Sequence, residues 1–78
     1  MKRRPIHVLL IDDDQDEFIV IRDLLAEATE DQFHLEWVGK FDEALEKMSA
    51  HSHDVYLIDY RLGARTGVEL IREAERRG

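Results

Sequence analysis

The sequence has 78 residues, enough for one small domain, and it contains no cysteine, which excludes disulfide bonds, thiol catalysis and thiolate zinc sites. A formal net charge of −7 argues against a domain that holds nucleic acid through its phosphates. The apolar stretch near the start, Val8–Ile11, is too short for a signal peptide or a membrane span, so we expect a cytoplasmic protein that contacts no membrane.

The first predicted elements are a buried strand and an amphipathic helix. Ile6–Ile11 is a nearly continuous apolar run that ends in Asp12–Asp14, which is typical of a strand buried on both faces of a parallel sheet. Asp14 and Glu17 then match a capping box, with Asp14 as the N-cap of the following helix. Apolar residues recur at helical spacing in this helix and form one stripe: Phe18, Ile21, Leu24, Leu25 and Ala28.

A weaker strand and a shorter helix are predicted next. Phe33–Val38 alternates apolar and polar residues, as a strand at the edge of a sheet would. The second helix is predicted from four apolar residues at helical spacing, Phe41, Ala44, Leu45 and Met48. His51 and His53 have the spacing of metal ligands, but the sequence supplies no third partner for them, and we expect a surface loop there.

The third strand and helix complete the pattern. Val55–Ile58 is a second apolar run, and it ends in Asp59. A capping box over Thr66–Glu69 opens the third helix, and Gly78 stands where a C-cap glycine would. The sequence therefore predicts an α/β fold in which three strands alternate with three helices.

The positions of the aspartates constrain the topology. Alternating strands and helices require crossover connections, which are right-handed in nearly all cases. Asp12 and Asp13 follow the first strand and Asp59 follows the third, and open α/β sheets bind ligands at these carboxyl ends. The three aspartates can share a site only if the first and third strands are neighbours, about 4.8 Å apart. We therefore predict the strand order 2-1-3, with helices on both faces.

Three carboxylates in one crevice repel one another, and loss of water strengthens the repulsion. Protons or a cation would relieve it, and oxygen ligands with open water positions suit Mg²⁺. A carboxylate beside Mg²⁺ is also a competent nucleophile toward a phosphoryl donor, which would give an aspartyl phosphate. A single aspartate at a strand end is more often a cap, which is how we interpret Asp14.

The motifs around these aspartates resemble those of a known family. Val8–Asp14 is similar to the opening strand and acidic pair of response-regulator receiver domains of bacterial two-component signalling, and Asp54–Asp59 is similar to the strand that carries their phosphoacceptor. Tyr60–Gly67 resembles the loop that follows, with a glycine eight positions after the acceptor, and Val68–Ile71 resembles the start of the next helix. The resemblance implies a flavodoxin-like (receiver) fold and a partial receiver domain over residues 1–78.

The resemblance also implies a function for individual residues. Asp59 would accept a phosphoryl group from the phosphohistidine of a sensor histidine kinase or phosphotransfer protein. Asp12 and Asp13 would form the acidic pair that holds Mg²⁺ beside Asp59, with Asp13 the more direct ligand, and Arg61 would offer its backbone carbonyl to the metal. The family provides a phosphoacceptor signalling domain and not an enzyme, so no residue is expected to be catalytic.

Two departures from the family pattern bear on these expectations. Gly63 stands where the family usually has a proline, which we expect to loosen the loop without touching a proposed ligand. A complete receiver has five βα units, and this sequence matches the first three. The Ser/Thr and Lys that contact the phosphate in the family lie at the ends of the fourth and fifth strands, so neither is assigned and normal switching is not expected.

The order 2-1-3 places the third strand at a sheet edge, although its apolar sequence belongs in a sheet interior. We therefore predict a homodimer or a domain swap through this strand, unless the sequence is a shortened form of a longer receiver.

Two alternative functions are also compatible with the sequence. A degenerate receiver could serve as an interaction or dimerisation module. A haloacid-dehalogenase-type phosphatase would use an Asp-x-Asp-x-Thr/Val motif, for which Asp12 and Asp14 supply the acids but Asp16 replaces the Thr or Val.

Overall fold

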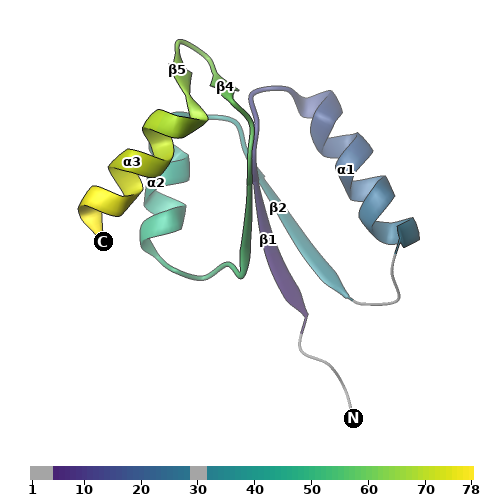
Figure 1. Ribbon diagram of the computed structural model, residues 1–78. Coiled ribbons are helices and arrows are strands. Elements are labelled where there is room, and N and C mark those ends of the chain that lie inside the picture. Colours follow the sequence, from purple (N-terminus) through teal and green to yellow (C-terminus); the bar gives the residue numbers. More distant parts are fainter. Residues whose placement is uncertain (1–4, 29–31) are drawn as a thin grey trace.

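The computed structural model describes residues 5–28 and 32–78, although the side chain of Ala28 lies outside this description. The chain forms an α/β layer structure in which α1 lies on one face of a central sheet and α2 and α3 lie on the other (Figure 1). The elements in chain order are β1 (Ile6–Ile11), α1 (Gln15–Ala28), β2 (Phe33–Val38), α2 (Phe41–Ser49), β3 (Val55–Ile58), β4 (Arg61–Leu62), β5 (Arg65–Thr66) and α3 (Gly67–Arg77). In the described ranges no helix is long and apolar enough to cross a bilayer.

The central sheet has the order β2-β1-β3 with both pairs parallel, which confirms the predicted topology. Its register sets Val8 of β1 beside Leu35 of β2 and Val55 of β3. The last residues of β1 and β3, Ile11 and Ile58, are also direct partners. The residues that follow these two strands therefore leave the sheet side by side.

A short antiparallel hairpin, β4–β5, is an element that the sequence did not predict. Arg61 pairs with Thr66 and Leu62 with Arg65. Each strand has only two residues, so no periodicity can reveal it. Leu62 is buried against the core, and this anchors the hairpin at the top of the sheet between β3 and α3 (Figure 1).

The hydrophobic core lies between the sheet and the α2–α3 layer. Leu9 and Ile11 of β1 and Leu70 of α3 are fully buried in it, and each such side chain contributes about 1.5–3 kcal/mol by leaving water. The core cluster consists of Leu9, Ile11, Val38, Phe41, Ala44, Leu45, Leu62 and Leu70. This cluster holds the sheet and the two helices as one unit beneath the strand ends.

The opposite face of the sheet is covered only in part. Val8 and Leu10 are buried there at 2% exposure, whereas their β3 partners Val55 and Leu57 stay 40% and 37% exposed. Leu24 of α1, which the sequence placed in the buried stripe, is 58% exposed. The helix α1 lies over β1 and β2 and leaves the β3 side of this face exposed. Part of the apolar stripe of α1 therefore stays exposed to solvent.

Both predicted N-caps are confirmed. The Asp14 carboxylate accepts a hydrogen bond from the Asp16 backbone N–H at 2.9 Å, and the Thr66 hydroxyl accepts one from the Glu69 N–H at 3.2 Å. At the other end of α3, Gly78 has a φ of +91° and donates its N–H to the Glu75 carbonyl. α1 and α3 thus begin, and α3 ends, where the sequence places their caps.

Candidate metal centre

Three carboxylates meet at the carboxyl edge of the sheet. Asp12, Asp13 and Asp59 each present an oxygen, and these oxygens lie within 4.8 Å of one another. Backbone hydrogen bonds continue the sheet by one residue past its strands: Asp59 donates to the Ile11 carbonyl at 2.9 Å, and Asp12 donates to the Val38 carbonyl at 3.1 Å. The main chain therefore holds the first and last of the three aspartates beside each other.

Charge accumulates in this cluster. Asp12 is buried, with 5% of its surface exposed, and this burial raises its pKa above the usual 3.8. The Asp14 N–H donates to Asp12 Oδ1 at 2.9 Å and lowers the pKa, whereas the negative charges of Asp59 and Asp13 raise it further. A divalent cation would offset the repulsion among these negative charges, and carboxylate oxygens are the ligands that Mg²⁺ prefers.

The β4–β5 hairpin contacts one of these carboxylates. The Gly63 backbone N–H donates to Asp13 Oδ2 at 3.2 Å, and Gly63 has a φ of +64°. Proline has no N–H and a φ fixed near −65°, so it can provide neither feature. The expectation that Gly63 touches no proposed ligand was therefore wrong, because the glycine allows a backbone contact to Asp13.

Gly67, the glycine eight positions after Asp59, lies at a close contact that requires glycine. Its N–H donates to the Tyr60 carbonyl at 2.7 Å, and it is buried at the start of α3. A Cβ built on Gly67 would lie 2.8 Å from Ile58 Cγ2 and would overlap the carbonyl oxygen of Asp59. Only glycine lets the first turn of α3 pack so closely on the residue that follows β3.

Trp37 is a contact of the site that sequence reasoning missed. Its indole Nε1–H donates to the Asp12 backbone carbonyl at 2.7 Å. Trp37 lies in β2 and Asp12 follows β1, 25 positions away, so no local sequence pattern predicts the contact. Arg61 opens β4 and has an exposed side chain, and the role of its carbonyl as a ligand stays a prediction.

Comparison with known proteins identifies the family. Residues 8–78 match the family model of the response regulator receiver domain. The chain belongs to this family. A solved CheY-like response regulator receiver domain from Methylobacillus flagellatus has the same fold, with a TM-score of 0.77 and 24% sequence identity over 92% of this chain. The chain spans 58% of the length of that receiver. No curated protein matches the sequence.

This receiver domain also contains a polar cluster that is separate from the aspartates. His53 Nε2 lies 2.7 Å from Glu36 Oε1, and Lys47 Nζ bonds the other oxygen of Glu36. His53 lies in the predicted loop between α2 and β3, and its side chain is only 7% exposed there. The hydrogen bond from Lys47, followed by that from His53, lowers the pKa of Glu36 below 4.5.

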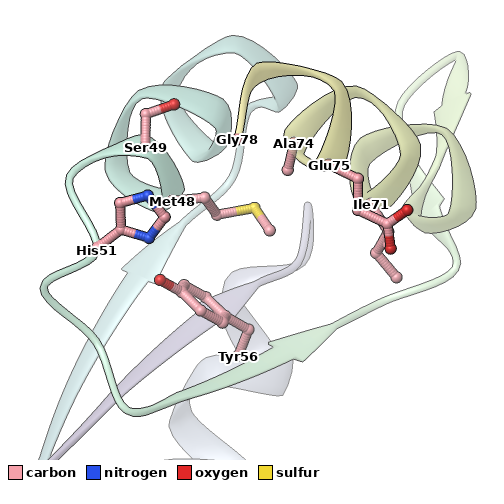
Figure 2. Close-up of a pocket in the computed structure, with 8 residues that line it drawn as sticks. All are labelled: Met48, Ser49, His51, Tyr56, Ile71, Ala74, Glu75 and Gly78. Carbon is pink, nitrogen blue, oxygen red and sulfur yellow. The ribbon is translucent and has the colours of Figure 1, made fainter.

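The receiver has an apolar pocket of about 230 Å³ between α2, β3 and α3 (Figure 2). Met48 and Tyr56 point into it from α2 and β3, and Ile71 and Ala74 approach from α3. None of the three clustered aspartates lines this pocket. The carboxylate cluster and this cavity are therefore separate features of the receiver.

Proposed function

We propose that this chain is the phosphoacceptor module of a two-component response regulator, which takes a phosphoryl group on Asp59 in the presence of Mg²⁺. The observation that carries the proposal is the convergence of Asp12, Asp13 and Asp59, whose oxygens lie within 4.8 Å at the carboxyl edge of a receiver sheet. The family supports a sensor histidine kinase or a phosphotransfer protein as the donor. The same family match favours a receiver over the phosphatase alternative.

The donor set fits a hard divalent cation. All the side-chain ligands are carboxylate oxygens, and the raised pKa of Asp12 indicates that negative charge is unfavourable there without a counter-charge. Asp12, Asp13 and Asp59 would hold Mg²⁺, and Arg61 would add its backbone carbonyl. When bound, Mg²⁺ would neutralise part of the charge on the transferring phosphoryl oxygens.

Asp59 would act as the nucleophile. One of its carboxylate oxygens forms a P–O bond to the phosphorus of a phosphohistidine while the P–N bond breaks. The electron pair of that bond returns to the imidazole, which leaves as neutral histidine when its other nitrogen carries a proton. The hydrogen bond from the Asp59 N–H to Ile11 fixes the main chain of the acceptor during this transfer.

Intact-mass measurement after incubation with acetyl phosphate and Mg²⁺ tests the proposal. The wild-type chain should gain one phosphoryl group, and Asp59→Asn should gain none. Asp13→Asn should slow the reaction and weaken Mg²⁺ binding. Asp14→Asn is the matched control, because asparagine caps helices as well as aspartate and Asp14 is not a proposed ligand. Phosphorylation of Asp59→Asn at the wild-type rate would refute the proposed acceptor.

We also propose that the open side of β3 is an association surface, as an interaction or dimerisation module would need. Among the described strands β3 pairs only with β1, so the polar groups of its other edge are open. Val55 and Leu57 add exposed apolar surface next to that edge. A homodimer or domain swap through β3 would cover both, in a cytoplasmic signalling protein.

A further inference from the structure

Three hydrogen bonds hold Asp12: one through its N–H, one through its carboxylate and one through its carbonyl, which is the oxygen of the Asp12–Asp13 peptide unit. Asp12 donates its N–H to Val38, and its carboxylate accepts from the Asp14 N–H at 2.9 Å. Its carbonyl oxygen accepts the Trp37 indole N–H at 2.7 Å. Because a peptide unit is planar, the direction of this carbonyl also sets the direction in which the chain continues to Asp13.

The indole is itself fixed in place. Its ring stacks on Phe18 of α1, with the centroids 5.8 Å apart and the planes 24° from parallel. Gly39 leaves room for its edge, since a Cβ there would lie 3.3 Å from Trp37 Cζ2 and 3.5 Å from the Asp12 carbonyl oxygen. The helix that carries Phe18 starts directly after Asp14, the residue whose N–H holds the Asp12 carboxylate. A closed ring of contacts therefore returns to Asp12.

The stacking of residue 37 on Phe18 does not require the indole N–H. A phenylalanine at position 37 could still stack on Phe18, because stacking uses only the ring faces. The indole N–H is the one polar atom that tryptophan adds, and it donates only. This donor is directed at the carbonyl between two of the three clustered aspartates. Its position indicates a role in the geometry of the carboxylates.

We propose that Trp37 is a positioning residue for the metal centre: its indole N–H orients the Asp12–Asp13 peptide so that the Asp13 carboxylate faces Asp12 and Asp59. The proposal rests on the proposed function in one respect, namely that these carboxylates bind Mg²⁺. Trp37 bonds the backbone carbonyl of Asp12 and not its carboxylate, so it acts through the main chain.

Two variants separate the donor from the ring. Trp37→Phe removes the N–H and part of the stacking surface. A chemically synthesised chain with 3-benzothienylalanine at position 37 keeps the shape of the indole and replaces the N–H by sulfur. Mg²⁺ affinity is measured by calorimetric titration of magnesium chloride alone, and the stability of each chain by thermal unfolding without metal.

We expect both variants to bind Mg²⁺ about fivefold more weakly than wild type, the loss typical of one hydrogen bond. The benzothienyl chain should unfold a few degrees below wild type because it lacks one hydrogen bond, and Trp37→Phe should unfold lower still because it also loses stacking surface. A purely structural tryptophan would give the benzothienyl chain wild-type Mg²⁺ affinity, and this would overturn the inference alone. Failure of the wild-type chain to bind Mg²⁺ would overturn the proposed function and the inference with it.

Discussion

Gly67 lies against the main chain of Asp59, and the contact leaves no room for a side chain. A Cβ on Gly67 would overlap the Asp59 carbonyl oxygen and come within 2.8 Å of Ile58 Cγ2. The Gly67 N–H also donates to the Tyr60 carbonyl at 2.7 Å. The start of α3 is thus packed directly on the proposed acceptor, and the position of one determines the position of the other.

We predict that Gly67→Ala lowers both stability and phosphorylation. Alanine is the better helix former by about 1 kcal/mol, but overpacking a backbone contact costs about 1–3 kcal/mol. The free energy of unfolding in urea should therefore fall by up to about 2 kcal/mol. Because the methyl group must displace Asp59, labelling by acetyl phosphate should fall further than stability alone explains. A chain that is more stable and fully labelled would contradict the contact.

Gly63 should tolerate neither alanine nor proline. Alanine keeps the N–H that contacts Asp13 but must adopt a φ of +64°, which costs about 1–2 kcal/mol. Proline loses the N–H as well and cannot reach this φ. We therefore expect unfolding free energies in the order wild type, Gly63→Ala, Gly63→Pro, with the weakest Mg²⁺ binding in the proline variant. Stabilisation by proline, the usual family residue, would show that the hairpin turns differently.

The Glu36 cluster should contribute a small, pH-dependent part of the stability. Its hydrogen bonds to Lys47 and His53 lower the pKa of Glu36 below 4.5. A lowered pKa in the folded state stabilises the fold above pH 4.5, and the contribution is lost as the pH falls through the lowered value. Glu36 is 44% exposed, so solvent screening limits the effect to less than about 1 kcal/mol.

Urea unfolding of wild type and Glu36→Gln at several pH values measures this contribution. The difference in unfolding free energy should be largest near neutral pH and should vanish in acid, where Glu36 is protonated in both states. High salt at neutral pH should shrink it as well. A difference that persists unchanged in acid would assign the effect to packing and not to charge.

Association through β3 should depend on concentration. Sedimentation velocity of the wild-type chain should show a coefficient that rises with concentration, and Leu57→Lys should suppress the rise by placing a charge on the exposed face. Val68→Lys is the control, since Val68 is an exposed apolar residue on α3. A wild-type chain that stays monomeric at all concentrations would exclude the association.

The sequence by itself determined the three strands of the central sheet, the three helices and the order of those strands. The apolar runs Ile6–Ile11 and Val55–Ile58 have the same bounds in the structure, and Thr66 caps the third helix as predicted. These features are encoded locally, by hydrophobic period and by side chains that bond backbone groups a few residues away. The order 2-1-3 was derived on the premise that Asp12 and Asp59 share a site, and the structure brings their carboxylates together.

Only the tertiary structure decided which distant groups support the site and which apolar residues stay uncovered. The bonds from Trp37 to Asp12 and from Gly63 to Asp13 join segments whose separation along the chain gives no periodic signal. The exposure of Leu24 likewise reflects how far α1 extends over the sheet, which its helical spacing cannot specify. Such contacts arise from the packing of whole elements, and packing depends on three-dimensional distances that a linear pattern does not contain.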